Sequence, residues 1–82
     1  MNVQLIQGEF NSKDAIDLLT QMIHVKIKYH EAKINSQSSE EDIKTRESKI
    51  KHLQKDLFEL RKTVNSKTNG VKVEAVIKIE SE

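Results

Sequence analysis

The chain has 82 residues, of which 33% are charged, and its 14 basic and 13 acidic residues leave a net charge of +1. A chain of this length forms one domain at most, and its balanced charge is untypical of a dedicated nucleic-acid-binding protein. Cysteine is absent, which excludes disulfides, thiolate catalysis and cysteine zinc sites. Packing and oligomerisation therefore remain as the means of stabilising so small a domain.

The start of the chain and its hydropathy predict a cytoplasmic protein without a membrane segment. Met1 is followed by Asn2, Val3 and Gln4, so the basic and apolar regions of a signal peptide are missing. No run of residues approaches the roughly 18 consecutive apolar residues of a membrane span. The lack of cysteine fits a reducing cytosol.

Residues 3–10 predict a strand, although their alternation of apolar and polar side chains is imperfect. Within this strand, Gly8 indicates a bulge or a close approach of another backbone. Asn11 or Ser12 then caps a helix that we expect over residues 12–34.

The apolar residues of the 12–34 helix form two adjacent stripes. On a projection at 100° per residue the stripes together cover roughly 220°, whereas a helix on a protein surface needs only about 100°. The first stripe is Ala15, Leu18, Met22, Val25, Tyr29 and Ala32, and the second is Ile16, Leu19, Ile23, Ile27 and Ile34. A helix with two stripes generally has two packing partners, so we expect this helix to lie at the centre of the structure.

A polar connector at residues 35–39 leads to a second helix, which we expect over residues 40–65. The capping-box sequence that runs from Ser38 to Glu41 marks its start. Its apolar residues form one narrow seam, interrupted only by Arg46, as in a helix with a single partner. The seam consists of Ile43, Ile50, Leu53, Leu57, Leu60 and Val64. The short connector predicts that the two helices are antiparallel.

Residues 71–80 give the clearest pattern in the chain. Val71, Val73, Ala75, Ile77 and Ile79 alternate with a mostly charged set, which predicts a strand with one apolar face. Before this strand, Gly70 or Asn69 can adopt the left-handed conformation that the turn requires.

The order strand, helix, helix, strand predicts an α+β domain spanning residues 1–82, in which an antiparallel helical hairpin packs on a small antiparallel sheet. A two-stranded sheet is only marginally stable and has two open edges. Pairing of two sheets across a two-fold axis removes two of these edges and gives the broad face of the first helix a second partner.

We therefore predict a homodimer that acts as a non-enzymatic protein-interaction module. The interface residues that we expect are Ile16, Ile23, Ile27, Val73, Ala75 and Ile77. The alternative is a monomer whose first helix packs on the second helix with one stripe and on the strands with the other. A further alternative is an adaptor that offers the same surfaces to a different protein.

Three basic side chains interrupt the apolar arc of the first helix near its C-terminal end: Lys26, His30 and Lys33. One interpretation is a positively charged pocket for an anionic ligand or for the carboxylate of a partner. In the other, the helix extends beyond its partners and the lysine side chains reach water, close to the negative end of the helix dipole. The second interpretation is favoured.

The second helix carries a row of lysines roughly opposite its seam: Lys44, Lys51, Lys55 and Lys62. Such a row could follow a phosphate backbone, so the alternative function is that of a nucleic-acid-binding accessory protein. Acidic residues interrupt the row at Glu47 and Glu59, and no aromatic row is present for stacking on bases. A solvated helix face is therefore the favoured interpretation.

No pattern of catalytic, cofactor-binding or metal-binding residues stands out. His24 and His30 are six positions apart, and a pair of helical metal ligands would be separated by four. Neither a glycine-rich phosphate loop nor a nucleophile motif is present. The sequence thus predicts no enzyme activity, no cofactor and no metal.

The sequence Gly8-Glu9-Phe10, together with residues 26–34, resembles small uncharacterised bacterial proteins of similar length. The resemblance covers about the first 35 residues. It implies a stand-alone bacterial protein rather than a fragment of a larger one, and it implies no particular activity.

Overall fold

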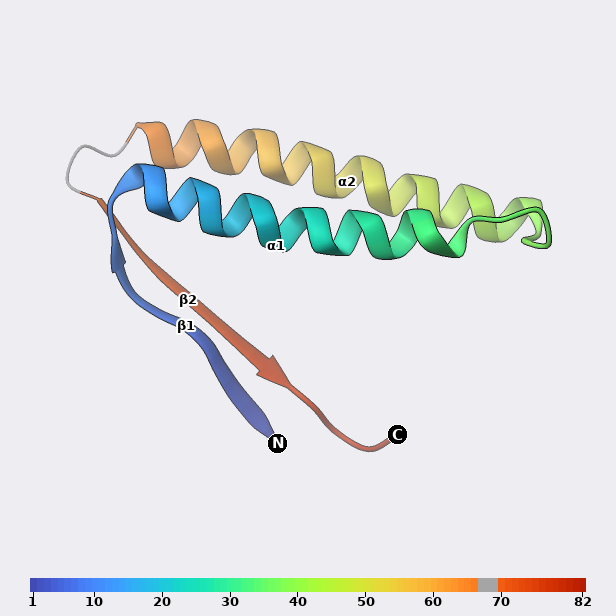
Figure 1. Cartoon of the computed structure of the whole chain (residues 1–82), viewed down its shortest axis with the longest axis horizontal. Helices are drawn as coiled ribbons and strands as arrows, with labels where there is room; N and C mark the ends of the chain where they lie inside the picture. The colour runs from blue at the N-terminus through green and yellow to red at the C-terminus, as the bar shows by residue number, and fades with distance from the viewer. Residues whose placement is uncertain (67–69) are drawn as a thin grey trace.

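The structure, a computed structural model, describes residues 1–66 and 70–82, so the alternative turn residue Asn69 lies outside the described residues. In chain order the elements are β1 (Asn2–Phe10), α1 (Ser12–Lys33), α2 (Glu40–Asn65) and β2 (Val71–Lys78). The helices form an antiparallel hairpin, and the strands pair in an antiparallel two-stranded sheet (Figure 1). The expected α+β class and β-α-α-β order are confirmed.

Both helices begin at side chains that bind their first backbone N–H groups. Asn11 Oδ1 accepts a hydrogen bond of 2.8 Å from the backbone N–H of Asp14, and Ser39 Oγ accepts one of 3.1 Å from that of Asp42. These N–H groups would otherwise have no partner within the helix. The cap of α2 is Ser39 because Ser38 is used elsewhere: its hydroxyl donates to a carbonyl at the end of α1.

The seam between α1 and α2 holds most of the buried core. Ser12 Oγ donates to the carbonyl of Val64 at 3.3 Å, and Arg46 Nη1 donates to His30 Nδ1 at 3.2 Å, near the opposite end of the hairpin. On the helical projection Ser12 and His30 lie on the same side of α1 as the second stripe. That stripe therefore faces α2, and Ile27 is buried in it opposite the seam of α2.

The sheet contains one β-bulge, which lies in β1. The pairing with β2 shifts between Gln4 and Ile6, so that Leu5 is the extra residue. Val3 and Ile6 are an odd number of positions apart, and a regular strand would place them on opposite faces. The bulge brings both onto the same face as the apolar residues of β2. Gly8 was expected to mark a bulge or a close backbone approach; the bulge lies at Leu5 instead, and the nearest atom to a Cβ at Gly8 would be a side-chain atom of Phe10 at 4.0 Å.

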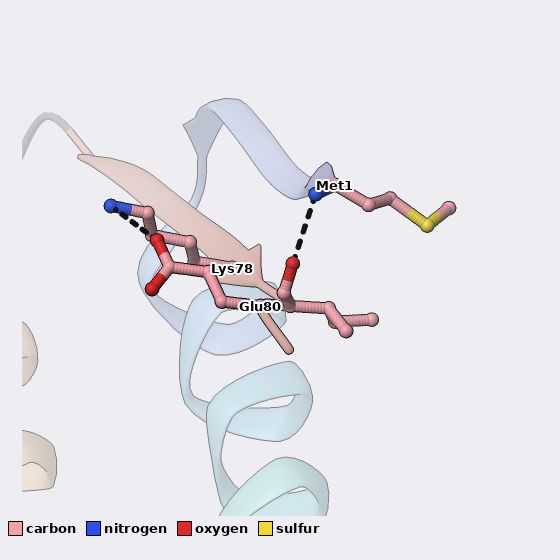
Figure 2. Close-up of polar contacts among 4 residues, drawn as sticks. Met1, Lys78 and Glu80 are labelled. Carbon is pink, nitrogen blue, oxygen red and sulfur yellow. Dashed lines mark hydrogen bonds and ion pairs between the residues drawn. The ribbon is translucent and has the colours of Figure 1, made fainter. Parts of the chain in front are cut away.

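Pairing of the strands continues to the first residue of the chain. The ammonium group of Met1 donates to the carbonyl of Ile79 at 2.9 Å (Figure 2). The N–H of Ile79 donates in turn to the carbonyl of Met1 at 2.8 Å. On the charged face of the sheet, Lys78 and Glu80 form an ion pair of 3.0 Å. Both side chains are mostly exposed, so this pair contributes little to stability.

The molecule is a single layer of elements. Its extents are 48 × 31 × 14 Å, and the shortest of these is close to the diameter of one helix. Figure 1, viewed along the shortest axis, shows α2, α1 and the sheet side by side, with α1 in the middle as expected. The sheet joins the helices at one end of the hairpin and diverges from α1 toward the chain termini.

The turn before β2 depends on Gly70, which has a φ of 86°, and a Cβ at this position would lie 2.7 Å from the carbonyl oxygen of Phe10. We expect Gly70→Ala to lower the free energy of unfolding by about 2 kcal/mol, because it adds both left-handed strain and a backbone clash. Urea denaturation measures this loss. Gly8→Ala is the control and should lose less stability, since its φ of 150° also strains an alanine but a Cβ there has no neighbour nearer than 4.0 Å. Equal losses in the two variants would show that the close approach to Phe10 has no energetic weight.

Candidate functional site

The first stripe of α1 is buried only at its beginning. Ala15 is fully buried, and Leu18 and Met22 are half-buried. Farther along the helix, Val25 is 69% exposed and Tyr29 is 51% exposed. The first stripe thus loses its cover in the direction in which the sheet diverges from α1.

The apolar face of β2 shows the same change along its length. Val71, Val73 and Ala75 are half-buried, whereas Ile77 is 43% exposed and Ile79 is still more open. Two apolar faces of the chain, the first stripe of α1 and this face of β2, are therefore covered where the helices join the sheet and open toward its far end.

The whole chain has more accessible surface than its mass predicts. Its solvent-accessible area is 6784 Å², and a compact monomer of this mass would expose about 5,000 Å². Its radius of gyration is 15.5 Å, where a compact chain of this length would have about 12 Å. About 1,700 Å² of surface is therefore exposed that a domain of this size would normally bury.

The structure places the six predicted interface residues in two different environments. Ile16, Ile23 and Ile27 belong to the second stripe, which faces α2 of the same chain; Ile27 is buried there, and Ile16 and Ile23 are half-buried. Val73, Ala75 and Ile77 lie on the apolar face of β2 that opens toward its end. On α1 the surface available to a partner is instead the first stripe, where the sequence-based prediction had selected no residue.

The second feature of interest is a basic cluster around Tyr29, near the open end of α1. Three cationic groups lie close to the ring centroid of Tyr29: Lys33 Nζ at 5.7 Å, Lys26 Nζ at 5.9 Å and Arg46 Cζ at 5.9 Å. Each lies within the distance of about 6 Å at which cation–π attraction acts. In the described part of the chain, no carboxylate lies within 4.0 Å of any of these three cations. The structure thus adds Arg46, from α2, to the predicted Lys26, His30 and Lys33.

His30 is the buried member of this cluster, with 3% of its surface exposed. Arginine can only donate, so the bond from Arg46 makes His30 Nδ1 the acceptor and leaves the hydrogen on Nε2. That Nε2 is buried and has no hydrogen-bond partner among the described residues. Burial lowers the pKa of His30, and the positive charges of Lys26, Lys49 and Arg46 lower it further. The imidazole is therefore neutral at pH 7.

The lysine row of α2 is exposed along the helix and forms no ion pair within residues 1–66 and 70–82. Glu47 and Glu59, which interrupt the row, are exposed as well. Phe58, which is 70% exposed, lies three positions after Lys55 and four before Lys62, so a single aromatic ring borders the row. One ring does not make a row for stacking on bases, and nucleic-acid binding stays a prediction of the sequence.

Residues 1–66 and 70–82 contain no group of three or more His, Asp or Glu side chains that could hold a metal ion. Nor do they contain a helix with the length and apolar character needed to cross a bilayer. Comparison of the chain with models of known protein families, with curated protein sequences and with solved structures finds no match.

The lowered pKa of His30 predicts that the folded state loses stability in mild acid. In the unfolded chain His30 binds a proton near pH 6.5, whereas in the folded chain it does so only at lower pH. Between these two values the unfolded state holds more protons, so the free energy of unfolding falls as the pH drops below about 6.5. Urea midpoints at pH 7.5, 6.5 and 5.5 should show this loss, and His30→Gln should reduce it.

The matched control for this experiment is His24→Gln, since His24 is exposed on the same helix. The control should keep the pH dependence of the original protein. A His30→Gln variant that loses stability in mild acid as steeply as the original protein would contradict the prediction.

Proposed function

We propose that the protein is a non-enzymatic interaction module that works as a cytoplasmic homodimer, in which a second copy supplies the layer that one chain lacks. The single-layer structure is the observation that supports this proposal, since domains are normally built from two packed layers around a shared core. A cytoplasmic location is further supported by the lack of cysteine.

The unburied area is of the right size for a stable dimer. If each of two copies buried its excess of about 1,700 Å², the interface would total about 3,400 Å², within the 2,000–5,000 Å² typical of obligate homodimers. A net charge of +1 leaves little electrostatic repulsion between two copies. Area and charge thus both favour self-association.

The two apolar faces suit a two-fold arrangement. In a symmetric dimer each contact occurs twice, so the first stripe of α1 from one copy can cover the apolar face of β2 from the other, and the reverse. Both faces are apolar and open toward the same end of the molecule. One symmetric interface would therefore cover both.

Of the two open sheet edges, that of β2 is better suited to pairing with a second copy. β1 is interrupted by the bulge at Leu5, and bulges disfavour edge-to-edge pairing. β2 itself has no extra residue, and its pairing register with β1 changes only opposite this bulge. Since Ile79 exchanges both backbone bonds with Met1, alternation along the strand directs the N–H of Val76 toward the open edge.

We expect the double variant Val25→Lys and Ile77→Lys to abolish the dimer, because both side chains are exposed in one chain and would place buried charges in the interface. Light scattering on a sizing column should report twice the chain mass of 9.5 kDa for the original protein and the chain mass for the variant. The control is Phe58→Lys, since Phe58 is 70% exposed and lies on α2 about 100° from Leu57. A purely monomeric original protein at 100 μM or so would contradict the proposal.

The role of the β2 edge can be tested with Val76→Pro. Proline removes the outward N–H of Val76 but no bond to β1, so it should weaken the dimer about tenfold and leave the fold of the chain intact. Val76→Ala keeps the N–H and should leave the dimer affinity nearly unchanged. Sedimentation equilibrium measures both affinities, and circular dichroism checks the fold. A dimer unaffected by the proline would show that β2 does not pair across the two-fold axis.

A further inference from the structure

The basic cluster continues into a hollow on the flank of the helix pair. Lys26 and His30 from α1, and Lys49, His52 and Leu53 from α2, line this hollow, whose volume is about 300 Å³. Small-molecule sites have volumes of roughly 300–1,000 Å³, so the hollow can take a compact ligand. Both helices of one chain build it, and it needs no second copy.

The charge of the hollow is positive and uncompensated. Lys26 and Lys49 stand on its two sides, and neither has a carboxylate within 4.0 Å in the described part of the chain. Lys33 and Arg46 add two further cations around the neighbouring Tyr29. Like charges at this density repel one another, and a bound anion would relieve that repulsion.

A second, independent observation that points to a ligand is a buried hydrogen-bond donor without an acceptor in the described part of the chain. His30 lines the hollow, and its Nε2 carries a hydrogen because Nδ1 accepts the bond from Arg46. Buried donors in folded proteins nearly always have an acceptor, yet this one has none among the described residues. An acceptor supplied by a ligand would complete the hydrogen bonding of the imidazole.

We infer that this hollow binds an oxyanion of the phosphate class. Lys26 and Lys49 neutralise its charge from the two helices, and His30 Nε2 donates a hydrogen bond to it once the flexible lining lysines shift to admit it. Arg46 is a positioning residue, because its bond to Nδ1 keeps the hydrogen of His30 on Nε2.

Phosphate suits the site better than a carboxylate does. Phosphate offers acceptor oxygens in several directions, and lysines bind it as point charges from opposite sides. A carboxylate is bound best by the planar fork of an arginine. Here Arg46 does not line the hollow, and its Nη1 already donates to His30.

The test is a titration of the full chain with inorganic phosphate at pH 7.5, followed by isothermal calorimetry and by the unfolding temperature. Sodium chloride of matched ionic strength is the reference, because it reproduces screening without a specific site. We expect saturable binding and a rise in the unfolding temperature with phosphate that chloride does not produce. The double variant Lys26→Gln and Lys49→Gln should bind phosphate at least about tenfold more weakly.

The matched control is Lys44→Gln with Lys55→Gln, which removes the same charge from exposed positions on α2. This control should bind phosphate as the original protein does. The inference is overturned if phosphate acts no differently from chloride, or if the control loses as much affinity as the Lys26 and Lys49 variant. It is also overturned if phosphate dissociates a dimer, since the cluster would then hold carboxylates of the second copy.

Discussion

The antiparallel packing of α1 on α2 is the contact on which the rest of the structure depends. It buries Ile27, Leu57 and Val64, and the other buried apolar side chains among the described residues are Ile6 of β1 and Ala15 of α1. Two hydrogen bonds fix its register near the ends, from Ser12 to Val64 and from Arg46 to His30. Because the second stripe of α1 packs on α2, its first stripe can be buried only by the sheet or by another molecule.

Much of this fold could be predicted because its signals are local. Capping side chains, apolar periods of 3.6 and 2, and a glycine with positive φ each depend on a few neighbouring residues. The choice between the two stripes of α1 is not local, and the prediction placed Ile16, Ile23 and Ile27 in a dimer interface. A usable signal did exist: His30 is one of the basic interruptions of the apolar arc of α1, Arg46 interrupts the seam of α2, and the two meet between the helices.

The candidate sites show where sequence reasoning ends. Lys26, His30 and Lys33 could be singled out from α1 alone, but Lys49, His52 and Arg46 join them only through the register of the helix pair. The divergence of the sheet from α1 has no local signal either. A chain of 82 residues has few apolar side chains to fill the space between two helices and a sheet. The result is seen in the structure as a large accessible surface area.

The pairing of β1 with β2 also has a consequence for the order of folding. About 60 residues separate the two strands along the chain, and closing so long a loop delays their pairing. The helical hairpin removes this delay, because it brings Ser12 beside Val64 and so leaves the strands joined by a short connection. The hairpin is built from neighbouring segments and can form within microseconds to milliseconds. The sheet is then the last part to form and the first to open, and its apolar face is presented to other molecules before the helices come apart.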